Sequence, residues 1–426
     1  MPAISVVIPV YNAAPFLREA MDSLLAQTCG DFEAIAVNDG STDNSLEILQ
    51  EYAARDSRIR ILDGPNGGYG KAMNRGMDAA TGKYMAILEP DDYLPREAYA
   101  VLLPQAEQHQ LDVVRGTHCC FYEEGNQRKY GYVIRVVGQS EVICPRKMGN
   151  KGFAHPPAIW SSLYRLSFLR DNGIRFHESP GASYQDTGFV FQALAFAERC
   201  QEIDEPVYMY RTDNPNSSVN NLGKKKWMLL YEYQRLREKL EVSPSIWESV
   251  KKQYYAHMVE GVVWVISQLT VSEGNELLPM FRGMLNDVDC EYVLPIYAPY
   301  LTIARNGGEL SDELLKRFES SPEVTLAVVR TRSFLGVPVY RVEMAPECTR
   351  RKLFGITIQS RYRREVYTAF SSGIKVSMAR RNDYYVMGVK VCSRRINESY
   401  GLHRADMQPA VVETGNRGLC VRKGGM

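Results

Sequence analysis

The sequence of 426 residues lacks the cysteine and histidine patterns that mark common metal sites and disulfide-rich proteins. Its nine cysteines show no CxxC spacing and its six histidines show no HExxH spacing, so we expect neither a structural zinc site nor a histidine-based metal site. The odd number of cysteines, with Cys119 and Cys120 adjacent, also argues against a disulfide framework. This cysteine usage favours reduced thiols and a cytoplasmic protein.

Long hydrophobic runs and a leader segment are missing as well. Candidate spans such as Gly261 to Ser272 and Tyr292 to Ala304 are uncharged for only 12 and 13 residues, whereas a transmembrane helix needs about 20. The chain enters a strand-like run, Ile4 to Ile8, without a basic region or a cleavage site, so we expect no signal peptide. These absences predict a protein that is soluble or peripheral to a membrane.

The composition is that of an ordinary globular protein, with 45% hydrophobic and 24% charged residues. It excludes a wholly disordered or fibrous chain, and the length predicts two or three domains. The net charge of +1 hides an asymmetry, because the 97 residues from Arg330 onward carry 19 Lys and Arg against 7 Asp and Glu. The preceding residues have a net charge of −11, so we expect the two parts of the chain to do different work.

The first 115 residues alternate short apolar runs with segments of helical period, which is typical of β-α-β units. Ser41 to Asp43 is expected to cap the second helix, and Tyr184 to Ala197 is expected to form a later one. Residues 116–160 are expected to contain extended strands and a mobile loop around Lys147 to Gly152. The predicted fold class is α/β with a Rossmann-like, mainly parallel sheet, whose first strands are 4–9, 33–38, 58–62, 84–88 and 111–115.

Beyond this α/β region the pattern changes twice. Residues 224–320 are rich in helical spacing. The tail that follows contains three similar units around Gly336, Gly355 and Gly388, which we interpret as strand-turn repeats. The predicted domains are an α/β domain at 1–220, a helical region at 221–322 and a basic, β-rich tail at 323–426.

An acidic sequence, Leu88 to Asp92, follows the expected strand at 84–88 directly. Ligands gather at the carboxyl ends of strands in open α/β sheets, and Glu89 and Asp91 at i and i+2 would point the same way in extended backbone. Two oxygen ligands so placed suit Mg²⁺ or Mn²⁺ shared with a diphosphate. The alternative is a capped turn, in which Asp91 or Asp92 is the N-cap of the following helix.

Three other segments lie at strand ends or turns. Asp39 ends the second expected strand, where it either accepts a hydrogen bond from the imide N–H of a pyrimidine base or belongs to a capped turn. Tyr11 follows the first strand, where its ring either covers a base or packs. Asn66 to Lys71 is rich in glycine but lacks the spacing of a P-loop, so it either approaches a phosphate or forms a flexible turn.

Five short segments, taken in order, closely resemble glycosyltransferase family 2: Val7 to Asn12, Val37 to Asp43, Ala72 to Gly76, Thr81 to Tyr84 and Glu89 to Leu94. The resemblance is strong over residues 3–115 and extends more weakly to about Val219. It implies the GT-A fold and metal-dependent, inverting transfer from a nucleotide-diphosphate sugar. It also implies a relation to bacterial cell-surface polysaccharide transferases.

The resemblance assigns roles to residues at the ends of the first strands. It implies that Pro9, Val10 and Tyr11 line the base pocket and that Asp39 binds a uracil-type edge, which favours UDP. It also implies that Asp91 holds the metal ion, Mn²⁺ or Mg²⁺.

Two positions depart from the family's pattern. Glu89, which Pro90 separates from the metal-binding aspartate, replaces the first acidic residue of the DxD motif, and its longer side chain would reach the ribose or the metal. Met73 stands where many relatives have arginine. Lys71, beside the backbone of Gly68, then becomes the expected phosphate contact.

The segment Ser183 to Phe189 resembles the family's acidic motif before a helix, with Gln185 in place of the usual glutamate. The resemblance places Asp186 at the catalytic base, which takes the proton of the acceptor hydroxyl, whereas a helix N-cap is the structural alternative. Trp160 and His155 are candidate acceptor contacts, and a core tryptophan and a structural histidine are their alternatives. The QxxRW pattern of processive synthases is absent, which favours transfer of a single sugar.

The sequence therefore predicts transfer of a sugar from a UDP-sugar to a hydroxyl group of a glycan or a lipid-linked acceptor. The alternatives are a nucleotidyltransferase and a catalytically silent subunit that binds a sugar nucleotide or a glycan. The basic tail carries no nucleic-acid motif, so we expect it to attract an anionic membrane at its cytoplasmic face rather than nucleic acid. A homo-oligomer, in which the tail clamps the acidic part of a second subunit, is the other alternative.

Overall fold

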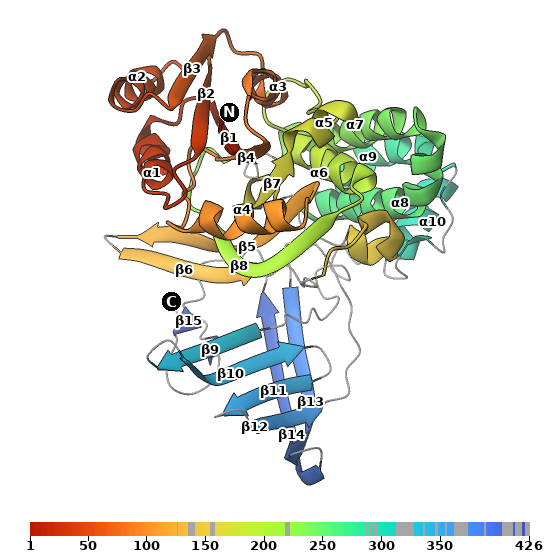
Figure 1. The fold of residues 1–426 in the computed structure, drawn as a ribbon. Helices are drawn as coiled ribbons and strands as arrows, with labels where there is room; N and C mark the ends of the chain where they lie inside the picture. Colours follow the sequence, from red (N-terminus) through yellow and green to blue (C-terminus); the bar gives the residue numbers. More distant parts are fainter. Residues whose placement is uncertain are drawn as a thin grey trace. The chain divides into compact units, whose positions relative to one another are not determined.

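The computed structural model describes residues 1–125, 127–134, 141–153, 158–217, 222–286, 288, 292–293 and 297–311, together with the strands of the tail, whose bounds are given below. The chain divides into two compact units, Met1–Leu310 and Ser311–Met426. Figure 1 traces the elements of both units along the chain. The first unit contains the predicted α/β region and the helices that follow it.

A sheet of eight strands forms the centre of the first unit (Figure 1). The strand order is β3-β2-β1-β4-β7-β5-β6, and β8 pairs with β5. The strands β1 to β4 are parallel to one another, which confirms the predicted α/β class and its mainly parallel sheet. The strands are β1 (Ile4–Val10), β2 (Phe32–Asp39), β3 (Ile59–Gly64), β4 (Tyr84–Ile87), β5 (Val113–Glu124), β6 (Gln127–Ile134), β7 (Ser162–Arg165) and β8 (Cys200–Arg211).

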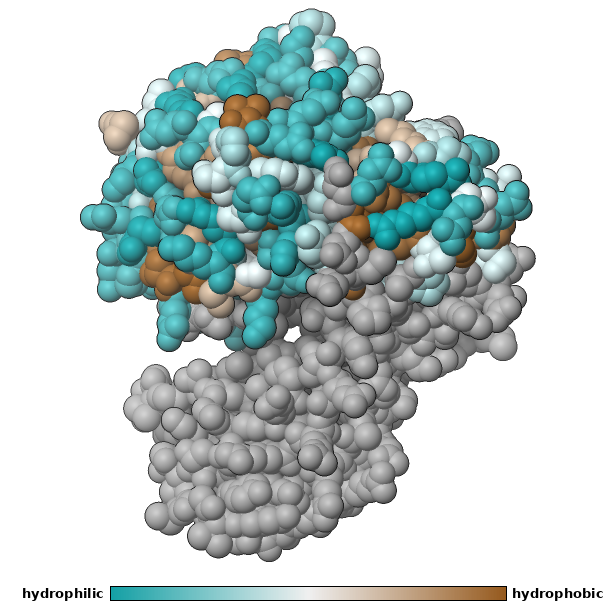
Figure 2. Space-filling view, turned by 90° about the vertical axis from the view of Figure 1, so that its right-hand side faces the viewer, coloured by the Kyte–Doolittle hydropathy of each residue, from teal (hydrophilic) through white to brown (hydrophobic). Residues whose placement is uncertain are grey.

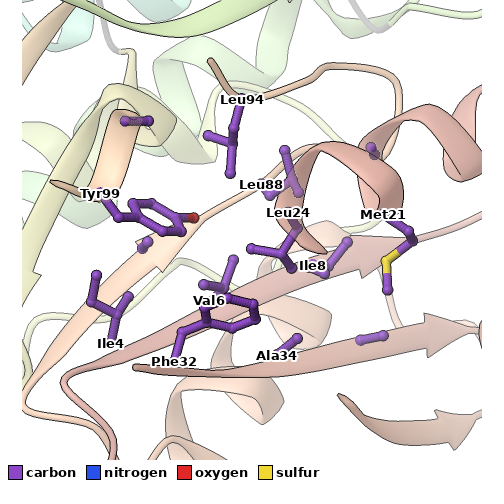
Figure 3. Packing of buried hydrophobic residues seen from close by; sticks show 14 of the residues in the cluster. Ile4, Val6, Ile8, Met21, Leu24, Phe32, Ala34, Leu88, Leu94 and Tyr99 are labelled. Atoms are coloured by element: carbon purple, nitrogen blue, oxygen red, sulfur yellow. The ribbon is translucent and has the colours of Figure 1, made fainter. Parts of the chain in front are cut away.

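Helices cover both faces of the parallel strands: α1 (Ala14–Leu25), α2 (Ser45–Arg55) and α4 (Ala98–Gln108) on one face, α3 (Tyr69–Ala79) on the other. Alternation along β1 sets this division, because successive side chains point to opposite faces. Val6 joins Leu24 of α1 and Tyr99 of α4 in one apolar cluster (Figure 3). Val7 faces α3, where a Cβ at Gly76 would come 2.3 Å from its Cγ1, so glycine lets α3 lie close to the sheet.

The middle of the first unit differs from the prediction. The strand predicted at 111–115 starts at Val113 and continues to Glu124, and β7 lies antiparallel between it and β4. The predicted mobile loop around Lys147 is wrong, because Pro145–Gly152 forms a 3-10 helix, η1, that packs against α6 (Gln185–Phe196) and α8 (Pro244–Ser267). Both ends of η1 are buried against each other, so tertiary packing orders a segment that has no local periodicity.

The remaining helices of the first unit follow the predicted pattern. Figure 1 shows α6, the helix predicted at 184–197, beside α7 (Leu222–Glu241) and α8, and contacts join all three. Helix α7 buries its apolar residues at the expected spacing of three and four, Leu230, Tyr233, Leu236 and Leu240. The other elements are η2 (Ile159–Ser161), α5 (Leu166–Asp171), α9 (Val271–Gly283) and α10 (Ala298–Asn306).

The face of the first unit drawn in Figure 2 is mostly hydrophilic, and its hydrophobic side chains form separate small patches. Within the described ranges, every helix is too short or too polar to cross a membrane. Tyr11 is one of the few large apolar side chains of the described residues that are exposed, at 52%. It follows β1 directly, at the same edge of the sheet as the other predicted site residues.

The second unit contains an antiparallel sheet in the order β14-β13-β12-β11-β10-β9 and a short pair, β15 and β16. Strands pair directly across each predicted turn: Phe334 with Val337, Leu353 with Ile356 and Val386 with Val389. The three repeats therefore lie between paired strands. These strands are β9 (Val328–Phe334), β10 (Val337–Ala345), β11 (Cys348–Leu353), β12 (Ile356–Arg361), β13 (Ile374–Val386), β14 (Val389–Leu402), β15 (Val412–Glu413) and β16 (Cys420–Val421).

Candidate active site

Three neighbouring parallel strands end at one edge of the sheet and bring the predicted residues together. β1 lies between β2 and β4, with Val10 opposite Asn38 and Val7 opposite Ile87. The carboxyl ends of these strands therefore lie side by side. We call this group the strand edge; its members are Pro9, Val10, Tyr11, Asp39, Glu89, Pro90 and Asp91.

The polar residues after β2 tie the ends of the first two strands together. Asn12 has a positive φ of 50°, and its Oδ1 accepts a hydrogen bond of 2.7 Å from the backbone N–H of Thr42. Asp43 Oδ2 accepts from the N–H of Ala14, in the first turn of α1, and its Oδ1 accepts from the N–H of Ser45. The expected cap of the second helix is therefore present, since Asp43 accepts from the first N–H of α2 as well as from α1, although the N-cap position itself is Asn44.

Asp39 is buried at the end of β2 and is hydrogen-bonded to the backbone of the glycine-rich segment. Its two carboxylate oxygens accept hydrogen bonds from the backbone N–H groups of Gly67 and Gly68, at 2.8 and 2.9 Å. Each carboxylate oxygen has a second lone pair, so these bonds leave acceptor capacity for a ligand. Lys71 is exposed in the first turn of α3, and its side chain packs over Gly67.

The glycines after Asn66 allow close contact with another part of the protein. Gly68 has a φ of 89°, and a Cβ there would come 2.8 Å from the carbonyl oxygen of Ser179. A Cβ at Gly70 would come 2.0 Å from the carbonyl oxygen of His177. The backbone that this segment approaches is thus residues 177–181, which lead into α6. The close approach of this backbone is sufficient to explain glycine at positions 68 and 70, without a phosphate contact.

Asn74 of α3 fixes the start of the same segment. Its Nδ2 donates to the carbonyl oxygen of Phe176 at 3.0 Å and to Glu178 Oε1 at 2.9 Å. Its Oδ1 accepts from the N–H of Phe176 at 3.1 Å. One buried amide therefore satisfies both backbone groups of Phe176, which attaches the chain before α6 to the sheet domain.

Glu89 is the first acidic residue after β4, and its carboxyl group is strongly perturbed. Burial raises its pKa to about 8, with the charges of Asp91 and Asp186 adding to the effect, although a 2.6 Å hydrogen bond from the hydroxyl of Tyr69 opposes it. Both aspartates thus lie near enough to act electrostatically on Glu89.

Asp91 and Asp92 have separate partners, and neither is a helix N-cap. Helix α4 starts at Ala98 with Glu97 as its N-cap, so the capped-turn alternative is wrong. Asp91 Oδ2 accepts a hydrogen bond of 2.8 Å from the side-chain amide of Asn214. Asp92 is buried, and its Oδ1 accepts from the N–H of Arg211 at 2.7 Å.

Several residues that contact this acidic group were missed from the sequence. The N–H of Glu89 donates to the hydroxyl of Tyr208 at 3.0 Å, and Arg211 Nε donates to the carbonyl oxygen of Asp91 at 2.9 Å. Tyr208 and Arg211 belong to β8, and Asn214 follows the end of this strand. The available signal was the apolar and aromatic run Val207 to Tyr210 before a polar turn, which is typical of the end of a strand.

Asp186 lies in the first turn of α6. The N-cap is Tyr184, at a φ of 62°, and it makes no side-chain capping bond, so the alternative of Asp186 as N-cap is wrong. Gln185 instead stabilises the turn, because its Nε2 donates to Ser179 Oγ at 2.7 Å while its Oε1 accepts from the N–H of Ser183 at 2.5 Å. A glutamate could not donate in this way while ionised. Burial raises the pKa of Asp186 to about 6.

The two candidate acceptor contacts have different outcomes. Trp160 is partly exposed and stacks on Tyr208 with ring centroids 4.2 Å apart, while His118 meets its ring edge-on at 4.5 Å. Its ring is thus part of an aromatic cluster that packs against the core. His155 lies outside the described residues.

The carboxyl groups of the strand edge are too few to hold a metal ion alone. They suit a metal ion that also binds the phosphates of a substrate. Among the residues that the structure describes, no group of three or more His, Cys, Asp or Glu is placed to hold a metal ion. Asp91, with Glu89 two positions before it, nevertheless offers hard oxygen ligands of the kind that Mg²⁺ or Mn²⁺ shares with substrate phosphates. Burial, with the charge of Asp91 adding to it, raises the pKa of Glu89, and a bound cation would favour the ionised form of this carboxyl group.

Comparisons with known proteins agree with this geometry. The family model for glycosyl transferase family 2 matches residues 5–168. EpsJ of Bacillus subtilis, an uncharacterized glycosyltransferase, is 39% identical over 228 residues, which cover 51% of this chain and 63% of EpsJ. YibD of Escherichia coli, also an uncharacterized glycosyltransferase, is 33% identical over 246 residues, which cover 56% of this chain and 70% of YibD. This chain therefore covers less than two thirds of the length of EpsJ and slightly more than two thirds of the length of YibD.

A solved structure shares the fold. The crystal structure of Staphylococcus aureus TarS 1–349 in complex with UDP-GlcNAc has a TM-score of 0.59 at 20% sequence identity, over 78% of this chain and 95% of that chain. TarS has the GT-A fold that the sequence predicted here. The family model, the identity to YibD and this fold lead to one conclusion: the chain belongs to glycosyltransferase family 2.

Proposed function

We propose that this protein transfers one sugar from a UDP-sugar to a hydroxyl group of a glycan or lipid-linked acceptor, with inversion at the sugar carbon. The observation that carries the proposal is the shared electrostatic environment of Glu89, Asp91 and Asp186. It brings a carboxylate that can act as a base near residues that can hold a cation and a diphosphate. Inverting transfer needs these two functions and no second catalytic carboxylate.

Asp186 takes the role of the base in this reaction. Its carboxylate accepts the proton of the acceptor hydroxyl while the acceptor oxygen forms a bond to the sugar carbon. The bond from that carbon to the diphosphate breaks, and its electron pair leaves with the diphosphate. A pKa of about 6 leaves Asp186 ionised at neutral pH yet more basic than an ordinary aspartate, which suits a general base.

The strand edge binds the donor. Asp39 accepts from the imide N–H of the base, Pro9, Val10 and Tyr11 line the base pocket, and Lys71 contacts the diphosphate. Asp91, with Glu89 beside it, would hold Mg²⁺ or Mn²⁺. When bound, such an ion supplies positive charge that stabilises the departing diphosphate.

The choice of UDP rests on Asp39 and on a structural neighbour. TarS 1–349 has been crystallised with UDP-GlcNAc and with UDP. UDP-GlcNAc is therefore the first donor to examine, followed by UDP-glucose and UDP-galactose.

The test is a product assay on the full chain. Purified protein, a UDP-sugar, Mn²⁺ and a mixture of cell-envelope glycans and lipid-linked saccharides are incubated together, and the nucleotide products are separated. Release of UDP that depends on the acceptor, with the opposite anomeric configuration in the product by NMR, supports the proposal. Release of pyrophosphate would indicate a nucleotidyltransferase, and binding of UDP-sugar without any product would indicate a silent subunit.

A further inference from the structure

The chain turns sharply after β8, at a sequence typical of a β-turn. The N–H of Ser217 donates a hydrogen bond of 3.1 Å to the carbonyl oxygen of Asn214. Asparagine is favoured at the first position of such a turn, and Pro215 takes the second, where its fixed φ fits. The side chain of Asn214 adds a second bond, because its Oδ1 accepts from the N–H of Asn216 at 2.9 Å. The local sequence therefore holds both the backbone and the side-chain amide of Asn214.

The nitrogen of this amide contacts the acidic residue after β4 that is proposed to bind a metal ion. Asn214 Nδ2 donates a hydrogen bond of 2.8 Å to Asp91 Oδ2. An ionised carboxylate only accepts hydrogen bonds, so it requires the nitrogen of the amide, while the oxygen of the same amide is bound within the turn. The bond involves one oxygen of the Asp91 carboxylate and leaves lone pairs on both oxygens for a cation.

Strand β8 also holds Asp91 through its backbone. Arg211 Nε donates to the carbonyl oxygen of Asp91 at 2.9 Å, and Arg211 Nη2 donates to Glu19 of α1 at 2.6 Å. The side chain of Arg211 is only 4% exposed, so these bonds are shielded from water. Arg211 therefore fixes the backbone of Asp91, and Asn214, three residues later, fixes its carboxylate.

We propose that Asn214 is a positioning residue for the metal site, which holds the carboxylate of Asp91 in the orientation that binds Mg²⁺ or Mn²⁺ together with the donor diphosphate. The inference rests on the proposed role of Asp91 as the metal ligand, and it extends that site to the turn after β8. A carboxylate that is already held loses less rotational freedom when it binds a cation. Removal of such a hydrogen bond from a ligating carboxylate typically costs about 10–100-fold in metal affinity.

The experiment measures UDP binding to the full chain by calorimetry, without metal and over a series of Mn²⁺ concentrations. The series gives an apparent Mn²⁺ affinity, and the sample without metal gives the affinity for the nucleotide alone. Asn214→Ala is expected to weaken the apparent Mn²⁺ affinity by roughly 10–100-fold. It should leave the metal-free UDP affinity unchanged, because the proposed base contacts, Tyr11 and Asp39 at the ends of β1 and β2, are untouched.

Two further substitutions separate the contact with Asp91 from the turn itself. Asn214→Ser keeps an oxygen that can accept from the N–H two residues later, but its side chain is shorter and lacks the amide that reaches Asp91. It is expected to weaken the Mn²⁺ affinity as much as Asn214→Ala does. Asn216→Ala is the matched control, because Asn216 is exposed in the same turn and keeps its backbone N–H, so it should follow the parent.

A parental Mn²⁺ affinity in Asn214→Ala would overturn the proposal. Recovery of that affinity in Asn214→Ser, or an equal loss of metal-free UDP binding, would also overturn it, since either result would assign Asn214 to the turn alone. Failure of the proposed function looks different, because Asp91→Ala would then bind UDP with the parental dependence on Mn²⁺, and the inference would fail with the metal site. Loss of that dependence in Asp91→Ala beside parental binding in Asn214→Ala removes only the role of Asn214.

Discussion

The strand edge and the segment 177–188 contribute to one site but are positioned by different kinds of contact. Residues of the strand edge follow neighbouring parallel strands directly, so the backbone register of β2, β1 and β4 determines where they lie. Residues 177–188 have no such sheet partner before α6. Side chains from elsewhere hold them, among them Asn74 of α3 and Lys225 of α7.

This difference separates the two halves of the proposed reaction. In the proposed reaction, donor binding would depend on residues that the sheet fixes within the first 91 positions, whereas the base would depend on a helix placed by contacts from both sides. Substitutions in the supports of residues 177–188 should therefore change turnover before they change nucleotide affinity.

Asp91→Ala removes the proposed metal ligand of the strand edge. Metal-dependent binding of UDP should be lost, and transfer should fall by at least about 10³-fold, because charge stabilisation by a bound metal is worth several kcal/mol. Calorimetry of UDP binding with and without Mn²⁺ measures the first effect. Asp31→Ala, at the opposite end of β2, is the matched control. Undiminished affinity in Asp91→Ala would remove the metal assignment.

Lowering the pH should reduce kcat, through protonation of Asp186, before it reduces donor binding. Asp186 has a pKa raised by burial to about 6 and works in its ionised form, so kcat should fall about tenfold per pH unit below pH 6. The pH dependence of kcat at saturating donor provides the measurement. A kcat that stays constant from pH 7 to pH 4.5 would contradict the role of Asp186.

Gly70→Ala acts at the contact between α3 and the segment 177–188. The new Cβ would come 2.0 Å from the carbonyl oxygen of His177, and relief of such overpacking costs about 1–3 kcal/mol. The melting temperature should fall by about 2–10 °C, given the few degrees per kcal/mol typical of a domain of this size. Gly283→Ala, where a Cβ meets nothing within 4 Å, should leave it nearly unchanged. Equal melting temperatures for the two variants would show that the contact is not as close as described.

Truncation at Arg330 should have the smallest effect on the chemistry. We propose that the basic tail attaches the protein to anionic membranes, since each Lys or Arg near such a surface contributes about 1 kcal/mol. The full chain should sediment with anionic vesicles but not neutral ones, less so at high salt, and the truncated chain should not. UDP binding should be the same in both. Equal recovery of both chains in the vesicle pellet would remove the membrane proposal in favour of the oligomer alternative.

The strand edge could be predicted because its residues are local in sequence. Each lies within four positions of an apolar run, and strands of parallel sheets read as such runs since both of their faces are buried. Asp39 and Glu89 were found in this way, and the order of strands and helices up to β5 followed from the same pattern. The helix that carries Asp186 was predicted to within one residue at each end.

The contacts that surround the acidic residues could not be predicted in the same way. Tyr208 meets Glu89 across 119 positions, and Asn214 meets Asp91 across 123. No local spacing encodes such pairs, because β8 reaches the site by pairing with β5 and by a backbone bridge between Met209 and Tyr93. The burial of Glu232 on α7, at 3% exposure, was missed for a similar reason, since a glutamate on an amphipathic helix is ordinarily exposed.

The most direct test of this account is the comparison of transfer and UDP binding in Asp186→Asn. The substitution keeps the shape of the side chain and removes the base, so transfer should fall by roughly 10²–10⁴-fold. UDP binding with Mn²⁺, measured by calorimetry on the same preparation, should match the parent, because the strand edge is unchanged. Transfer at the parental rate would contradict the central claim that Asp186 is the base.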